Sequence, residues 1–176
     1  LSPLVGGTTA SFAGYLSQVP SVSTAGTVIT LAEGSSTTVT IDGIVYGIKP
    51  GDSVLVNFNN EMTSTTLPGA VTVTAILDNV GNTISAGQAY GLIYSATEQA
   101  AYVSLGAGWP KGTLFRLTVS THAEEINGMR LVTFSTVNFA TARDFAAANT
   151  VISPAEPGTK VEIPANAFPS DYSIAI

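Results

Sequence analysis

Residues 37–58 read TTVTIDGIVYGIKPGDSVLVNF, and this stretch decides the fold class. Its β-branched and aromatic residues are interrupted at Asp42-Gly43, and an Asp-Gly pair between two such runs is the strongest local signal for a β-hairpin. A Pro-Gly-Asp turn signal follows and comes directly before the alternating run SVLVNF. The stretch therefore predicts three short strands joined by tight turns.

The same pattern of short strand-like runs and turn signals continues to the end of the chain. Residues 70–77, 89–95 and 159–163 predict further strands. Residues 95–105 and 141–148 begin with Ser-x-x-Glu and Thr-x-x-Asp, which predicts one or two short capped helices. Many short strands with little helix indicate an all-β protein with a single β-sandwich, either a jelly roll or an Ig-like relative.

The longest coherent unit, residues 114–139, predicts a hairpin folded about Asn127-Gly128. A two-residue turn there places Glu125 opposite Arg130 as a cross-strand ion pair. With that register one face of the hairpin is apolar and half-buried, and it carries Leu117, Val119, Val132 and Phe134.

Composition excludes several classes of function. Only 10% of the residues are charged, the net charge is −6 and the six basic residues are scattered. An acidic surface repels phosphate, so we expect neither nucleic acid nor an anionic membrane as a partner. No apolar run approaches the length of about 18 residues that a membrane-spanning helix needs. The chain has no cysteine, which removes disulfides, thiolate metal sites and cysteine nucleophiles.

Few residues suggest catalysis or metal binding. His122 is the only histidine. On a β-ribbon it shares a face with Glu124 but not with Glu125, and zinc would need further ligands. We therefore interpret His122 as part of a solvated hairpin end rather than as a zinc ligand. The oxygen-rich segments at 57–61 and 78–82 fit turn chemistry better than calcium. Trp109 is interpreted as a core or interface residue. No catalytic motif occurs, so we expect no enzyme activity, no metal and no cofactor.

The N-terminal segment differs from the rest. The first charged residue is Glu33, and residues 1–32 mix apolar residues with Thr, Ser and Gly. We divide the chain into an arm, residues 1–25, and a β-sandwich domain, residues 26–176. The sequence starts with Leu and this segment lacks the features of a signal peptide, so we expect a mature, secreted chain. There is no Asn-x-Ser/Thr sequon, which excludes N-linked glycan, whereas O-linked sugar stays open.

Residues 8–16 (TTASFAGYL) alternate with the period of a strand, and a strand cannot stay unpaired in water. Two interpretations are open. The segment is either the first strand of its own sandwich or a donor strand that completes the sheet of a neighbouring copy, which is the mode called β-augmentation. We favour donation, because head-to-tail addition builds an open filament and the neutral arm suits a dry groove. The candidate donor-strand residues are Thr8, Thr9, Ala10, Ser11, Phe12, Ala13, Gly14, Tyr15 and Leu16.

A family resemblance supports donation. The neutral N-terminal strand, the run GTVITL at 26–31 and the run GIKPGD at 47–52 leading into VLVNFNN resemble the TasA/camelysin biofilm-fibre proteins and the related archaeal bundling pilins. The resemblance covers roughly the first half of the chain. It implies a secreted jelly-roll subunit that donates its N-terminal strand to its neighbour.

The sequence therefore predicts an extracellular structural subunit that polymerises with copies of itself into a pilus-like filament or fibre by donor-strand complementation. Two alternatives remain at this point. One is a phage or virus structural protein, such as a capsid decoration or tail-tube subunit, which shares the β-rich, cysteine-free, low-charge profile. The other is a secreted ligand-binding β-module.

Overall fold

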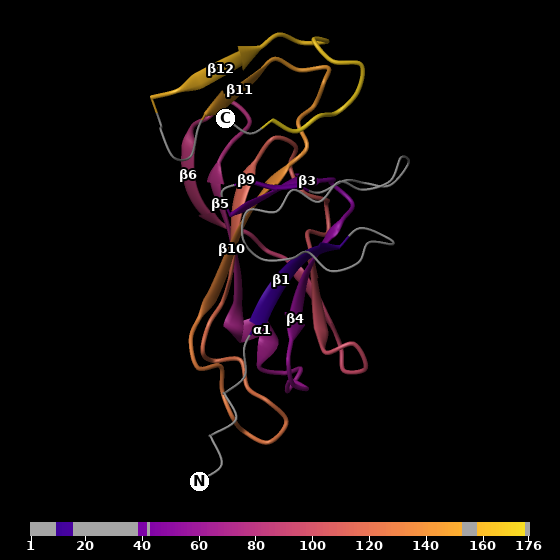
Figure 1. The fold of residues 1–176 in the computed structure, drawn as a ribbon, viewed down its shortest axis with the longest axis vertical. Coiled ribbons are helices and arrows are strands. Elements are labelled where there is room, and N and C mark those ends of the chain that lie inside the picture. The colour runs from indigo at the N-terminus through magenta and orange to yellow at the C-terminus, as the bar shows by residue number, and fades with distance from the viewer. Residues whose placement is uncertain (1–9, 16–38, 42, 153–157, 175–176) are drawn as a thin grey trace.

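The computed structural model describes residues 10–15, 39–41, 43–152 and 158–174. These residues form an all-β sandwich with one short helix, which confirms the predicted fold class (Figure 1). The elements are β1 (Ala10–Tyr15), β2 (Val39–Ile41), β3 (Ile44–Ile48), β4 (Ser53–Phe58), α1 (Leu67–Ala70), β5 (Val71–Leu77), β6 (Thr83–Gly87), β7 (Gly91–Ser95), β8 (Ala100–Ser104), β9 (Leu114–Val119), β10 (Ser135–Thr141), β11 (Asn149–Ile152) and β12 (Lys160–Ile163).

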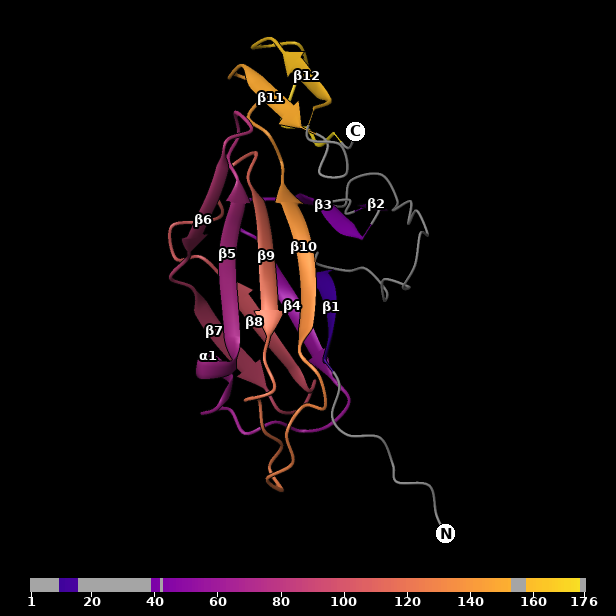
Figure 2. The same cartoon turned by 90° about the vertical axis from the view of Figure 1, so that its left-hand side faces the viewer.

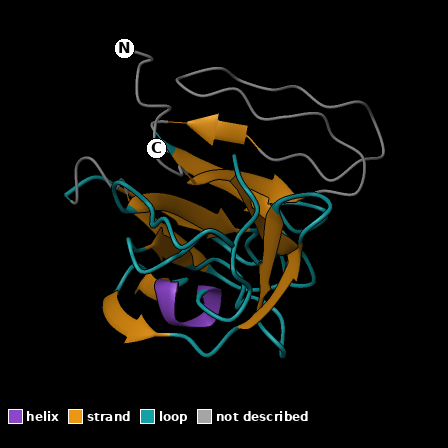
Figure 3. Ribbon diagram, turned by 90° about the horizontal axis from the view of Figure 1, so that it is seen from below, coloured by secondary structure: helices purple, strands orange, loops and turns teal. Residues whose placement is uncertain are grey.

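Two sheets face each other, and a separate ribbon lies at one end. The four-stranded sheet has the order β1-β4-β8-β7, and the six-stranded sheet has the order β2-β3-β10-β9-β5-β6. β3 and β10 run parallel, whereas the other described pairs are antiparallel. The β11–β12 ribbon extends the molecule at one end, and the loop between β9 and β10 extends it at the other (Figures 1 and 2). Figure 3, seen from below, shows α1 beside the strands at the loop end.

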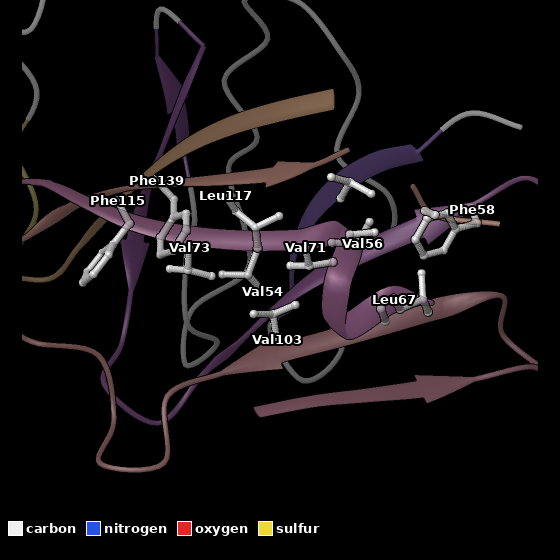
Figure 4. Close-up of a cluster of buried hydrophobic side chains, with 14 of the residues drawn as sticks. Val54, Val56, Phe58, Leu67, Val71, Val73, Val103, Phe115, Leu117 and Phe139 are labelled. Atoms are coloured by element: carbon white, nitrogen blue, oxygen red, sulfur yellow. The ribbon is translucent and has the colours of Figure 1, made fainter. Parts of the chain in front are cut away.

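The core lies between the sheets because each strand turns alternate residues inward. In β4, residues Val54, Val56 and Phe58 are buried and their neighbours are partly exposed (Figure 4). Trp109 is only 1% exposed and packs edge-on against Phe115, with ring centroids 5.2 Å apart. Its position confirms Trp109 as a core residue.

Two turns have the chemistry that their sequences predict. Ile41 pairs with Ile44 across the Asp-Gly turn, and Gly43 has a φ of 75°. Between β5 and β6, the Asp78 carboxylate accepts hydrogen bonds from the backbone N–H of Val80 (3.0 Å) and of Asn82 (2.7 Å). Desolvation raises the pKa of Asp78, but bonds from the Asn82 side chain and from backbone N–H groups outweigh it and hold the pKa below its usual value.

The register predicted for the 114–139 hairpin is wrong by one residue. β9 pairs with β10 so that Val119 lies opposite Ser135 instead of Thr136. At the turn, the backbone N–H of Glu125 donates to the carbonyl of Met129 (2.7 Å) and that of Gly128 donates to the carbonyl of Glu125 (3.0 Å). Residues 126–128 thus form a three-residue loop, with Gly128 at a φ of 85°.

This one-residue shift moves side chains to the opposite face, because a strand has a period of two. Leu117 and Val119 are buried as predicted, whereas Val132 and Phe134 are exposed. The predicted Glu125–Arg130 pair is also wrong. Arg130 pairs instead with Glu124, at 3.3 Å between Nε and Oε2.

Neither predicted helix forms. Residues 95–105 contain the turn between β7 and β8, where Gln99 adopts a φ of 51°. The Thr141 hydroxyl donates to the carbonyl of Pro110 (2.6 Å) instead of capping a helix, because Thr141 ends β10. Among the described residues, the helix that does form is α1, with Pro68 in its first turn.

Two glycines with similar backbone angles allow a matched test of steric crowding. Gly108 has a φ of 80°, and a Cβ there would lie 2.9 Å from the Pro50 carbonyl oxygen. Gly128 has a φ of 85° and open space around it. We expect Gly128→Ala to lower the free energy of unfolding by about 1 kcal/mol through backbone strain alone. We expect Gly108→Ala to lower it by about 2–3 kcal/mol, because the Pro50 junction must also shift. Urea unfolding measures both, and equal losses would contradict the crowding at Gly108.

Candidate assembly site

The candidate donor strand forms β1 at the edge of the four-stranded sheet. All six residues of β1 pair antiparallel with β4, from Ala10 opposite Phe58 to Tyr15 opposite Ser53. Opposite residues of an antiparallel pair belong to the same face of the sheet. The register therefore assigns position 12 to the face of the buried Val56, and the strand period predicted for this segment matches that register.

β4 is the strand that receives β1, and it is held firmly on its other side. Val54 pairs with Val103 and Val56 with Ala101 of β8, and these four residues are buried. Phe58 lies edge-on to the ring of Tyr94, with centroids 6.3 Å apart. Without a strand in the place of β1, the apolar residues of β4 and one row of its backbone N–H and C=O groups would form an unprotected edge.

The turn before β4 positions its first residues. Asp52 accepts a hydrogen bond from the backbone N–H of Lys49 through its carboxylate (2.9 Å). The Trp109 indole N–H donates to the Asp52 carbonyl (2.7 Å), and the Trp109 backbone N–H donates to the Pro50 carbonyl (2.8 Å). The core tryptophan therefore fixes the start of β4, where Tyr15 pairs with Ser53.

Six of the nine predicted donor residues, Ala10–Tyr15, form β1, whereas Thr8, Thr9 and Leu16 lie outside the described residues. Within one chain β1 pairs with its own β4, which is the geometry of the first-strand interpretation. Exchange between copies uses the same ladder with a β1 from another chain. Donation therefore remains a prediction, now with a defined acceptor strand, β4, and a defined register.

The residues considered for a metal site do not come together. The His122 ring contacts the hydroxyl of Ser120 (3.2 Å between Nδ1 and Oγ), and Glu124 pairs with Arg130. Glu125 is 2% exposed and its carboxylate accepts a hydrogen bond from the Asn60 amide (2.9 Å). In the part of the chain that the structure describes, no group of three His, Asp or Glu residues is placed to hold a metal ion.

Sequence reasoning missed the structural role of Glu125. Besides the Asn60 amide, the Thr63 hydroxyl donates to the Glu125 carbonyl (2.9 Å), and Met62 forms an isolated bridge with Glu125. These contacts join the loop between β9 and β10 to the segment after β4. The sequence offers one signal, because Asn60 and Thr63 are polar residues between two apolar strands, but their partner is distant in the chain.

No protein-family model matches this chain, and no curated protein matches it. Among the described residues, no helix has both the length and the apolar character needed to cross a membrane.

Proposed function

We propose that this protein is an extracellular structural subunit that polymerises into a pilus-like filament by donating its N-terminal strand to a neighbouring copy. The observation that carries the proposal is the six-residue edge ladder between β1 and β4. A segment without charge covers the apolar edge of β4, and residues 16–38 are the covalent connection from β1 to the rest of the sandwich. The function is structural and involves neither catalysis nor a cofactor.

The connection is long enough for exchange. A fully extended chain spans about 3.4 Å per residue, so residues 16–38 reach up to roughly 80 Å. A compact chain of this size has a radius of gyration of about 16 Å, which corresponds to roughly 40 Å across. A β1 strand can therefore reach the β4 edge of an adjacent copy while its own domain stays folded.

A filament forms only if pairing of β1 between chains is more stable than pairing within one chain. Pairing within a chain and pairing between chains form the same ladder, so replacing one with the other is nearly neutral in enthalpy. Pairing within the chain is favoured at low concentration, because the covalent connection holds β1 at an effective concentration of up to about millimolar. A stable filament therefore needs a further contact between copies that the single chain does not make.

Cysteine cross-linking tests the proposal, because the natural chain has no cysteine. Position 13 lies opposite Leu55 on the partly exposed face of β4. Two single variants, Ala13→Cys and Leu55→Cys, are assembled as a mixture and treated with a short bismaleimide. We expect a covalent dimer on a denaturing gel, because each chain of the linked pair carries one cysteine.

The double variant Ala13→Cys/Leu55→Cys distinguishes β1 paired within its own chain from β1 paired with another chain. Donation predicts a ladder of covalent multimers from the assembled material, and each single variant alone provides the control for chance contacts. An internally linked monomer from the double variant, together with no dimer from the mixture, would refute donation.

A further inference from the structure

The loop between β9 and β10 projects from one end of the molecule and carries a group of exposed apolar residues (Figure 1). Each of these residues is between 51% and 69% exposed. Single exposed apolar residues are common on proteins, whereas a group of large ones marks an interaction surface. We call this group the apolar loop residues, and they are Ile126, Met129, Val132 and Phe134.

The loop that carries the apolar loop residues is fixed to the sandwich. Leu131 is buried, and its backbone N–H donates to the carbonyl of Ala123 (3.1 Å). The backbone N–H of Ile126 donates to the carbonyl of Glu61 (3.2 Å). The exposed side chains are thus presented by a backbone that is held in place, which lowers the entropy cost of covering them.

The glutamates and the arginine of this loop already have partners. Glu124 pairs with Arg130, at 3.3 Å between Oε2 and Nε. Glu125 is buried, and its carboxylate accepts a hydrogen bond from the Asn60 amide (2.9 Å). The surface therefore suits an apolar segment that brings no charged side chain, because a charge would lose water here without gaining a partner.

β1 begins at the same end of the sandwich. Ala10 pairs with Phe58, and Glu61, which accepts the bond from Ile126, lies three residues after Phe58. Paired Cα atoms are about 5 Å apart and three residues span up to roughly 11 Å, so Ile126 lies within about 20 Å of Ala10. β1 also lies beside β10, which begins directly after Phe134 (Figure 2).

The sequence that precedes β1 has the required composition and length. Residues 1–9 read LSPLVGGTT, with Leu4 and Val5 at the centre and no charged side chain. Leu4 is six residues from Ala10. An extended chain spans about 3.4 Å per residue, so Leu4 can lie up to roughly 20 Å from Ala10, the distance at which the apolar loop residues begin.

We propose that residues 1–9 of the chain that supplies β1 cover the apolar loop residues, with Leu4 and Val5 as the contacting side chains. The occupant of this surface is therefore a segment of this protein. The inference goes beyond strand donation and does not depend on it, because residues 1–9 start from the same place on β4 whichever chain supplies β1.

Cross-linking with a short bismaleimide tests the contact and leaves every apolar residue in place. The double variant Pro3→Cys/Asn127→Cys joins the segment to an exposed polar position beside Ile126. The control is Pro3→Cys/Thr97→Cys, since Thr97 is exposed and lies two residues from Gln99, whose carbonyl accepts from the Phe58 backbone N–H (2.8 Å). Both positions are within similar reach of Ala10. We expect at least about fivefold more linked product with Asn127→Cys, because docking raises the effective concentration above that of a tether alone.

A charge in the segment provides the second arm of the test. Leu4→Asp, added to Pro3→Cys/Asn127→Cys, should reduce linking to the level of the Thr97→Cys control, because the carboxylate cannot be buried against apolar side chains. Ser2→Asp adds the same charge beside Pro3 and should leave linking unchanged.

The outcomes separate this contact from strand donation. Equal linking at Asn127→Cys and Thr97→Cys, or equal effects of Leu4→Asp and Ser2→Asp, would refute the contact whatever the Ala13→Cys and Leu55→Cys mixture gives. Preferential linking at Asn127→Cys supports the contact in either product: an internally linked monomer means that β1 pairs within its own chain, and covalent multimers mean that it is donated. Donation can therefore fail while the contact stands, and the contact can fail while donation stands.

Discussion

Deletion of residues 1–20 is expected to give a subunit that folds but no longer assembles. The deletion removes β1, so β4 becomes an edge strand, and its buried residues Val54, Val56 and Phe58 lose a neighbouring strand. Assembly by donation then has no donor, whereas the paired strands that contain the rest of the core remain. Electron microscopy and sedimentation measure assembly, and the fluorescence of the buried Trp109 reports the fold.

The truncated subunit should also bind the peptide TTASFAGYL, which corresponds to residues 8–16. Burial of large apolar side chains contributes about 1.5–3 kcal/mol each, and backbone pairing with β4 adds to that. A control peptide with Phe12→Asp should bind at least about 100-fold more weakly, because the register sets position 12 opposite the buried Val56. Calorimetric titration measures both peptides. Normal polymerisation of the truncated chain would show that the arm is not the connector.

Trp109→Ala is expected to have the largest effect on stability. Trp109 is 1% exposed, its ring lies 5.2 Å and 5.0 Å from the rings of Phe115 and Phe139, and its indole N–H donates to the Asp52 carbonyl. We expect the free energy of unfolding to fall by about 3–5 kcal/mol, as for other buried aromatic residues that are truncated to alanine. Urea unfolding measures the change.

Trp109→Phe is the matched control for this prediction. It keeps an aromatic ring in the core but removes the donor to the Asp52 carbonyl, so we expect a smaller loss of about 1–3 kcal/mol. A loss below about 1 kcal/mol for Trp109→Ala would show that the sandwich does not depend on this residue. Because Trp109 also holds the turn before β4, we expect assembly to weaken in parallel with stability.

Local sequence was sufficient for most strands. β3 and β4 have the bounds that their runs of β-branched and aromatic residues predict, since turn residues interrupt those runs on both sides. The period of two in residues 8–16 also matches the register of β1 on β4. In each case the signal lies within a few residues and depends on backbone preference and alternation alone.

The register of the 114–139 hairpin was not determined locally. An Asn-Gly pair suits either a two-residue turn or a three-residue loop with glycine at a positive φ, and the two differ by one residue in register. Burial of Leu131, together with the bond of the buried Glu125 carboxylate to Asn60 in the segment after β4, favours the second. The exposure of Val132 and Phe134 follows from that choice, so sequence reasoning placed these two residues on the wrong face.

The sequence alone therefore determined the fold class, the strands and the unusual neutrality of the N-terminal segment. Only the tertiary structure decided that residues 10–15 of this segment pair with β4, that Trp109 holds the turn at one end of that ladder, and that a small pocket forms where β11 meets the ends of β5, β9 and β10. The physical reason is that alternation and turn chemistry act between near neighbours, whereas strand order and pockets depend on which distant surfaces exclude water together.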